Sequence, residues 1–285
     1  MEFASRIVRV PGLVPGREFE LEVLADDSII GPSIERDGTW EIFETTLFRA
    51  HLARMPAGGR VVDLGANIGW YSTLAILAGA DVQAFEPVPG IADVAERNMQ
   101  RAMEVGPGRG VLHRAAAGAE RGTAEIALAA RNRGDNRVLD DGNVPADLGD
   151  AETLTIDVLP VDEVVEGPAR ILKVDTQGSE WHALQGARRL LETSPELCLL
   201  VELWPYALRG AGPGRLLGFL EEQGFTLGKA TAAPYPMSPE RILRQVLARD
   251  PVKGGIDLYC TRGVPFHVGD AKTRLRSLWR RLKED

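Results

Sequence analysis

The segment from Val61 to Ser72 constrains the fold of this chain more than any other part of the sequence. A short apolar run leads into two glycines four positions apart, Gly65 and Gly69, and a helix-forming run follows them. Because glycine adopts the positive φ angles that tight turns require, this pattern predicts a strand, a turn and the start of a helix. A second predicted strand, 82–86, comes next and ends in an acidic residue. Two strands joined by a helix predict an α/β fold whose ligand lies at the carboxyl ends of parallel strands.

Strands and helices alternate from about residue 60, which is typical of a mostly parallel sheet with helices on both faces. We expect a domain over 59–265, with a lead-in over 1–58 before it and a β-hairpin-like insertion over 120–165. Residues 266–285 are expected to form a basic amphipathic helix, docked on the acidic body or in contact with a membrane surface or a partner. The strands expected in the sheet are 60–64, 82–86, 110–115, 170–174, 197–202, 224–229 and 256–261. The expected helices are 40–54, 70–79, 90–104, 180–193 and 212–223, and the lead-in also has an expected strand at 19–24.

The charge balance argues against a nucleic-acid-binding protein. The chain has 33 basic and 41 acidic residues, a formal net charge of −8, whereas sequence-independent binding of nucleic acid needs an excess of Lys and Arg. The expected partner is a small molecule or a protein, and a homo-oligomer stays open. We find no secretory signal at the N-terminus and no apolar run long enough to span a membrane. Cys198 and Cys260 each lie in an expected strand, so two buried thiols and a cytoplasmic location are expected.

The turn between Asp63 and Gly69 carries the first indication of a ligand. A phosphate-binding loop requires the pattern G-x-x-x-x-G-K-[ST], which the chain lacks, and a dinucleotide-binding turn has a third glycine. Asp63 stands two positions before Gly65, where it would repel a pyrophosphate but can meet the ammonium of a methionine moiety, directly or through water. Asn67 adds an amide group to the same turn. The turn is therefore interpreted as the site of S-adenosylmethionine rather than of NAD.

Glu86 follows Gly65 by 21 residues, at the carboxyl end of the second predicted strand. A carboxylate at this point can accept hydrogen bonds from both ribose hydroxyls, the role of an acid about 20 residues on in dinucleotide folds. Taken alone, Glu86 could equally be an exposed loop acid. Its spacing in the sequence from Asp63 and the two glycines favours the ribose contact.

Two further acids end strands that are expected to be neighbours in the sheet. Asp175 follows the fourth predicted strand and Glu202 ends the fifth. Two such carboxylates can act as a base and its orienting group, or share a divalent cation such as Mg²⁺, which is the less favoured alternative. Glu202 could instead form a salt bridge with Arg209. Glu180 opens the following helix, where an acid either stabilises the helix N-terminus or takes part in the site.

The remaining candidates have simpler structural explanations. Strand alternation places Lys173 on the same side as Asp175, and a buried lysine needs a partner, so a structural ion pair is the favoured reading. His182 is a weaker catalytic candidate, since a solvated or packed histidine is more common on a helix. Asn136 and Arg137 lie in the insertion, where they are plain loop residues or contacts to cofactor or substrate.

Three sequence runs together resemble the FkbM-type S-adenosylmethionine-dependent methyltransferases. They are VDLGANIG at 62–69, FEP at 85–87 and LKVDTQGSE at 172–180, the last followed by Leu184 and Gly186. The resemblance covers roughly residues 40 to 262 and implies the Rossmann-like class I methyltransferase fold, a seven-stranded, mostly parallel sheet whose last strand is antiparallel. Members often carry an acid at the position of Gln177, so the role of that acid is not carried over.

The resemblance also implies a site. The methionine part of S-adenosylmethionine would contact the residues of the glycine turn, and Glu86 would contact the ribose. The predicted cofactor contacts are Asp63, Gly65, Asn67, Gly69, Tyr71, Ser72, Glu86, Pro87, Asn136 and Asp175. The predicted catalytic residues are Asp175 as the leading base, then Glu202 and His182. No metal ligand is assigned, and Asp175 and Glu202 are the pair to hold a divalent cation if one is used.

The predicted reaction is in-line transfer of a methyl group from the sulfonium to a hydroxyl of a sugar or specialised metabolite, as in natural product biosynthesis. Such a transfer needs close alignment of the reactants and a group that removes the hydroxyl proton. An N- or carboxyl-methyltransferase acting on a small molecule or peptide is the first alternative. A non-catalytic cofactor-binding protein is the second, and an NAD enzyme is least favoured because the third glycine is missing.

Overall fold

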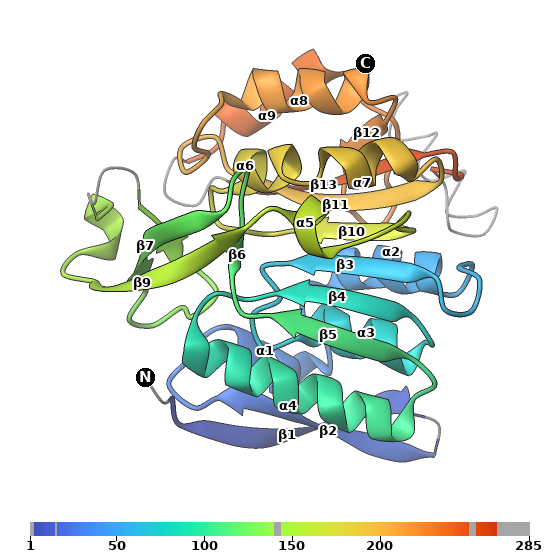
Figure 1. The fold of residues 1–285 in the computed structure, drawn as a ribbon, viewed down its shortest axis with the longest axis vertical. Coiled ribbons are helices and arrows are strands. Elements are labelled where there is room, and N and C mark those ends of the chain that lie inside the picture. The colour runs from blue at the N-terminus through green and yellow to red at the C-terminus, as the bar shows by residue number, and fades with distance from the viewer. Residues whose placement is uncertain (1–2, 15, 140–143, 251–254, 267–285) are drawn as a thin grey trace.

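A seven-stranded sheet lies at the centre of the computed structural model, which describes residues 3–14, 16–139, 144–250 and 255–266. Its strands are β3 (Arg60–Leu64), β4 (Asp81–Phe85), β5 (Arg109–His113), β10 (Ile171–Val174), β11 (Leu197–Leu203), β12 (Thr226–Lys229) and β13 (Ile256–Arg262). The spatial order is β12-β13-β11-β10-β3-β4-β5, and β13 runs antiparallel to both of its neighbours while the other pairs are parallel (Figure 1). This confirms the mostly parallel sheet with an antiparallel last strand.

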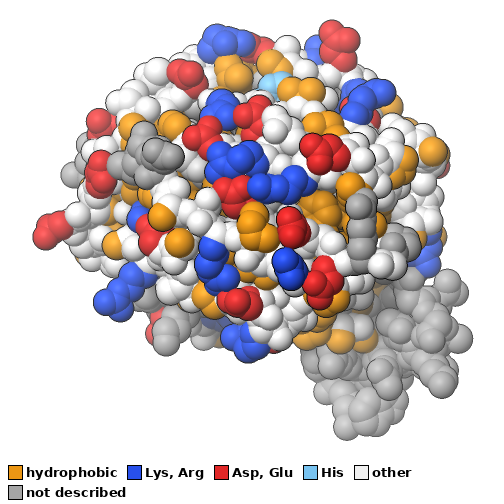
Figure 2. Space-filling view, turned by 90° about the horizontal axis from the view of Figure 1, so that it is seen from below, with side chains coloured by type: hydrophobic (Ala, Val, Ile, Leu, Met, Phe, Trp, Pro, Cys, Tyr) orange, Lys and Arg blue, Asp and Glu red, His pale blue; other side chains and the backbone are white. Residues whose placement is uncertain are grey.

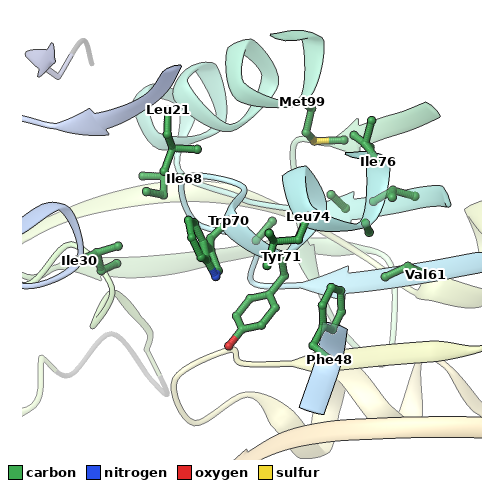
Figure 3. Close-up of a cluster of buried hydrophobic side chains, with 14 of the residues drawn as sticks. Leu21, Ile30, Phe48, Val61, Ile68, Trp70, Tyr71, Leu74, Ile76 and Met99 are labelled. Carbon is green, nitrogen blue, oxygen red and sulfur yellow. The ribbon is translucent and has the colours of Figure 1, made fainter. Parts of the chain in front are cut away.

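Alternate residues of the central strands pack into two hydrophobic clusters, one on each face of the sheet. Val61 belongs to the first cluster and Val62 to the second, and Cys198 and Cys260 are divided between them in the same way. Because both faces are buried, the strands are continuous apolar runs, which made them recognisable in the sequence. The first face is covered by α3 (Trp70–Leu77) and α4 (Pro89–Val105), whose cluster Figure 3 shows. The second is covered by α6 (Glu180–Gln185), α7 (Arg188–Thr193), α8 (Pro213–Glu222) and α9 (Pro239–Leu247).

The lead-in forms a hairpin and two helices that pack on the first face. Its elements are β1 (Ser5–Val14), β2 (Arg17–Leu24), α1 (Ile30–Asp37) and α2 (Ile42–Leu52). The buried side chain of Asn98, on α4, bonds both backbone groups of Glu22 on β2 and donates to the carbonyl of Ile68 at 2.8 Å. Arg97 and Arg101 pair with the Glu22 carboxylate. The lead-in is thereby fastened to the glycine turn. The face of the molecule seen in Figure 2 has acidic and basic side chains interspersed.

The insertion is a small sheet beside the main one. It contributes β7 (Gly122–Leu128), β8 (Arg137–Val138), the short 3₁₀ helix η1 (Ala146–Leu148) and β9 (Glu152–Leu159), and β6 (Ala116–Ala117), just before the insertion, completes the small sheet. The strands β7 and β9 pair antiparallel along their length, as in a hairpin, and β8 and β6 add to the two edges to give the order β6-β9-β7-β8. The short helix α5 (Val161–Val164) then leads back to the central sheet.

Several elements differ from the sequence prediction. The helix expected over 180–193 is divided into α6 and α7 at Gly186, where the backbone passes so close to Gly118 that a Cβ atom would clash with its carbonyl oxygen. The strand β1 and the helices α1, α5 and α9 were not expected. The terminal helix predicted for 266–285 falls, beyond Phe266, outside the described residues. None of the helices in the described ranges combines the length and apolar character needed to cross a membrane.

Candidate active site

A cleft of about 390 Å³ opens at the carboxyl ends of the central strands. Its lining includes Gly65 after β3, Glu86 after β4, Asp175 after β10 and Glu202 near the end of β11. The strand order reverses between β3 and β10, because β4 and β5 continue on one side while β10 and β11 continue on the other. Open α/β sheets bind ligands at such a switch point, and the volume lies in the range of small-molecule sites.

The cleft has two halves with different chemistry. The glycine half, beside β3 and β4, consists of Gly65, Ala66, Asn67, Glu86 and Pro87. The carboxylate half, beside β10, β11 and β13, consists of Glu41, Lys173, Asp175, Glu202 and Asp257. Glycine, amide and backbone groups therefore dominate one half, whereas four acids and a single lysine form the other.

The two glycines of the turn occupy conformations that other residues rarely adopt. Gly65 and Gly69 have φ angles of 81° and 78°. A Cβ atom on Gly65 would clash with the backbone carbonyl of Asp175, and one on Gly69 would press against the backbone of Ala95. The spacing of these glycines therefore reflects two close approaches, to the end of β10 and to α4, besides the turn itself.

Glu86 is held at the edge of the turn by backbone groups. One carboxylate oxygen accepts a hydrogen bond from the N–H of Asn67 and the other from the N–H of Val88, each at 3.0 Å. Burial raises the pKa of Glu86 to about 7. Asn67 itself has a φ of 51°, and its side-chain amide donates to the carbonyl of Arg133 in the insertion at 3.0 Å. An acid that is buried but lines a cleft is suited to accepting hydrogen bonds from hydroxyl groups of a ligand.

Asp63 lies behind the turn. Its buried carboxylate accepts a hydrogen bond from the hydroxyl of Ser72 at 2.7 Å, and burial raises its pKa. Asp63, Gly69 and Ser72 are outside the set of residues that line the cleft, whereas Tyr71 and Pro87 are within it. The structure therefore gives Asp63 a place in supporting the turn, and its contact with a methionine ammonium stays a prediction.

Lys173 forms the centre of the carboxylate half. Its ammonium lies 2.7 Å from the carboxylate of Asp175 and 3.6 Å from that of Glu41, and the side chain is only 5% exposed. The ion pair predicted for Lys173 and Asp175 is thus confirmed. The side chain of Gln177 donates to Asp175 at 2.6 Å and to Glu202 at 2.8 Å. The amide of Gln177 therefore bridges two carboxylates.

Glu202 and Asp257 lie opposite each other on the antiparallel strands β11 and β13. Burial raises the pKa of Glu202 well above its usual range, and the carboxylates of Asp175, Glu180 and Asp257 raise it further. Burial also raises the pKa of Asp257 well above its usual range, with Glu41 adding to the effect. Each of these carboxylates therefore disfavours the ionised form of the others.

Glu180 closes the turn that follows Asp175. Its carboxylate accepts hydrogen bonds from the backbone N–H groups of Thr176 and Gly178, each at 3.0 Å. Burial raises the pKa of Glu180 to about 7, and the side chain is fully buried. Glu180 is absent from the cleft lining, so the structure favours the turn-stabilising role over a direct part in the site.

Residues of the insertion form one wall of the cleft. Asn136 lines it, but its side chain accepts from the N–H of Ala129 at 2.9 Å and donates to the carbonyl of Arg133 at 2.9 Å. Arg137 pairs with Asp135, and its guanidinium lies 4.3 Å from the ring centroid of Trp204. These contacts fix the shape of the wall, and a direct contact between Asn136 and a cofactor stays a prediction.

His182 lies on α6, outside the set of residues that line the cleft. The half-buried ring packs where a Cβ atom on Gly210 would clash with it. Arg209, the alternative partner proposed for Glu202, donates a hydrogen bond to the hydroxyl of Ser179. The place of His182 outside the cleft lining does not support its predicted catalytic role.

The structure does not support the alternative of a divalent cation at the described residues. They contain no group of three or more His, Cys, Asp or Glu side chains arranged to hold a metal ion. Asp175, one of the two predicted ligands, already accepts hydrogen bonds from Lys173 and Gln177.

Residues 63–227 match the model of the FkbM methyltransferase domain. This chain belongs to the FkbM methyltransferase family. The match spans more than half of the chain and includes the glycine half together with Lys173, Asp175 and Glu202. With the sheet order described above, it establishes the class I methyltransferase fold expected from the sequence. No match was found among curated proteins.

Similar solved structures are also methyltransferases. An FkbM methyltransferase from Methylobacillus flagellatus is 20% identical with a TM-score of 0.45, over 71% of this chain and 43% of that chain. This chain thus covers less than half the length of that protein. The magnesium protoporphyrin IX methyltransferase of Synechocystis, solved with SAM bound, is 13% identical with a TM-score of 0.41, over 78% and 81% of the two chains. A putative methyltransferase from Streptococcus mutans, in complex with SAH (S-adenosylhomocysteine), is 11% identical with a TM-score of 0.44, over 79% of this chain and 99% of that chain.

Two acids of the carboxylate half were missed in the sequence. Asp257 could have been found, because it follows from pairing the predicted strands at 197–202 and 256–261 antiparallel, with the second acid opposite Glu202. Glu41 had no such signal, since it lies in the lead-in before a helix and is brought to the cleft by the packing of α2.

Proposed function

We propose that this chain transfers a methyl group from S-adenosylmethionine to a hydroxyl group of a sugar or specialised metabolite. The observation that carries the proposal is the division of one cleft into a glycine half and a carboxylate half at the switch point of the sheet. A cofactor held on one side and an acceptor on the other would meet where β3 and β10 are neighbours.

The residues of the glycine half fit the adenosyl cofactor. Gly65 lines the cleft and has no side chain, so a ligand can approach its backbone closely. The buried carboxylate of Glu86 lines the cleft and is suited to the two ribose hydroxyls, whose hydrogen bonds would favour its ionised form. When bound, the cofactor supplies an electrophilic methyl group on a positively charged sulfur.

The carboxylate half fits an acceptor with a hydroxyl group. An unactivated alcohol needs a base within hydrogen-bonding reach, and this half provides four carboxylates around Lys173. Asp175, the leading base predicted from the sequence, accepts hydrogen bonds on both of its oxygens, from Lys173 and from Gln177. We therefore propose that Asp175 orients the half, while another carboxylate receives the proton. Burial and the neighbouring carboxylates raise the pKa of Glu202 well above its usual range, which favours its protonated form.

Methyl transfer is tested with methyl-labelled S-adenosylmethionine and a panel of hydroxylated sugars and specialised metabolites, with and without a metal chelator. We expect label in an ether product, at the same rate with the chelator. Label found only on amines or carboxylates of a matched panel would contradict O-methylation. We expect partial turnover by Asp175→Asn, because Asp175 orients the carboxylate half without removing the proton. Full turnover would show that Asp175 has neither role, whereas complete loss would return Asp175 to the role of base.

A further inference from the structure

Three non-glycine residues have left-handed backbone conformations in the described part of the chain, and all three line the cleft. They are Glu41, Asn67 and Gln177, with φ angles of 44°, 51° and 50°. Such conformations are strained for residues other than glycine and asparagine, and they persist at functional sites where the surrounding structure holds them. Asn67 forms the glycine turn and Gln177 bridges two acids. Glu41 precedes the segment that matches the family, so its conformation needs a separate explanation.

Glu41 occupies the N-cap position of α2 but does not cap it. Acids at this position usually accept hydrogen bonds from backbone N–H groups of the first helical turn, and the side chain of Glu41 makes none. Its Oε2 instead accepts a hydrogen bond from the hydroxyl of Tyr71 at 2.7 Å and lies 3.6 Å from the ammonium of Lys173. The strained backbone therefore directs the carboxylate into the cleft.

The two partners of Glu41 come from the two sides of the switch point. Tyr71 is on α3, directly after the glycine turn, and its ring packs edge-on against Phe48 while its hydroxyl points away from the hydrophobic cluster (Figure 3). Lys173 is on β10 and lies over the ring of Tyr71, 4.7 Å from the centroid. Glu41 therefore stands at the junction of the two halves, where a methyl group has to pass from one to the other.

Glu41 is also better placed to receive a proton than Asp175. Asp175 has hydrogen bonds to both oxygens, and Glu202 already accepts one from Gln177. Both of these contacts of Glu41 involve Oε2, and Glu41 lines the cleft, so Oε1 is the oxygen that we assign to the acceptor. Burial raises the pKa of Glu41, which makes its carboxylate more basic, while the charge of Lys173 and the hydroxyl of Tyr71 favour the ionised form.

We propose that Glu41 is a catalytic residue that binds the acceptor hydroxyl and removes its proton, an inference that rests on the proposed function. The hydroxyl proton moves to Oε1 of Glu41, and a lone pair of the acceptor oxygen forms the new bond to the methyl carbon. The carbon–sulfur bond breaks and its electron pair stays on sulfur, which becomes a neutral thioether. Tyr71 and Lys173 hold the carboxylate in position throughout.

Sinefungin tests this placement without knowledge of the acceptor, because it carries a protonated amine in place of the transferable methyl group. Affinities for sinefungin and for S-adenosylhomocysteine are measured by calorimetry on the unmutated chain and on Glu41→Gln. We expect the unmutated chain to prefer sinefungin by about tenfold or more, since opposite charges attract strongly in a buried cleft. In Glu41→Gln this preference falls below about threefold, while the affinity for S-adenosylhomocysteine changes by less than about threefold.

Two further variants make the result specific. Glu35→Gln makes the same chemical change at an exposed position of the lead-in and should keep the full preference for sinefungin. If Glu41→Gln keeps the preference, or if Glu202→Gln loses it instead, the proposal for Glu41 is overturned. It is also overturned if Glu41→Gln weakens both ligands equally, which would indicate a role in folding or cofactor binding. Absence of S-adenosylhomocysteine binding by the unmutated chain would contradict the proposed function itself.

Discussion

The two halves of the cleft are built in different ways. The glycine half comes from one continuous segment, 63–87, in which a strand, a turn, a helix and the next strand follow each other directly. The carboxylate half comes from four segments that are far apart in the chain, and two of its acids, Glu41 and Asp257, lie outside the residues that match the family. Under our proposal, the cofactor is bound by one segment of the family domain, whereas acceptor chemistry also requires Glu41 and Asp257 from outside the matched residues.

The largest effect is expected for Gly65→Ala, because this residue is where the two halves touch. The added Cβ atom would clash with the backbone carbonyl of Asp175, and the φ of 81° is unfavourable for alanine. We expect the free energy of unfolding to fall by about 3 kcal/mol or more, measured by urea denaturation. Gly218→Ala, on α8 with open space around it, is the matched control and should be neutral or stabilising by up to about 1 kcal/mol. Equal stability of the two variants would mean that the halves do not meet at this turn.

Lys173→Met should affect the carboxylate half and spare the glycine half. Removing a buried lysine leaves Asp175 and Glu41 without their cation, and we expect a loss of about 3 kcal/mol in unfolding free energy. Arg9→Met, which removes an exposed cation, should cost no more than about 0.5 kcal/mol. The affinity of Lys173→Met for S-adenosylhomocysteine should stay within about threefold of the unmutated chain. A tenfold loss would show that the two halves are not separate in function.

The smallest effect is a pH dependence that belongs to the glycine half. Burial raises the pKa of Glu86 to about 7, and the ribose hydroxyls would bind its ionised form. Protonation therefore competes with the ligand, and affinity for S-adenosylhomocysteine should rise with pH, by up to about tenfold per pH unit below pH 7, and level off above it. Glu86→Gln, which cannot ionise, should bind weakly with no such rise between pH 5.5 and 8.5. Titration calorimetry at fixed ionic strength measures both curves, and parallel curves would assign the titration to another group.

The same difference explains what the sequence could predict. Gly65, Gly69 and Glu86 follow strands closely, so local turn geometry and strand ends were enough to place them together. Asp175 and Glu202 were placed as neighbours from the usual order of parallel strands, and the register confirms that their strands pair. Glu41 was not predicted, because its place depends on how α2 packs on the sheet, and no local pattern encodes that contact.

The break between α6 and α7 could also not be predicted from local sequence patterns. Apolar spacing over 180–193 is compatible with one helix, and the break at Gly186 coincides with the close approach of Gly118, which lies between β6 and β7. His182, in contrast, was predicted to lie in the site because it is near Asp175 in the sequence. The helix turns it to a position outside the cleft lining.

The most direct test of the central claim is calorimetric titration with S-adenosylhomocysteine of the unmutated chain, Glu86→Ala and Glu202→Gln. Two lost hydrogen bonds to a charged group predict about a hundredfold weaker binding in Glu86→Ala. The change in Glu202→Gln, on the other half of the cleft, should stay within about threefold. No binding by the unmutated chain, or equal losses in the two variants, would contradict the account of one cofactor half and one acceptor half.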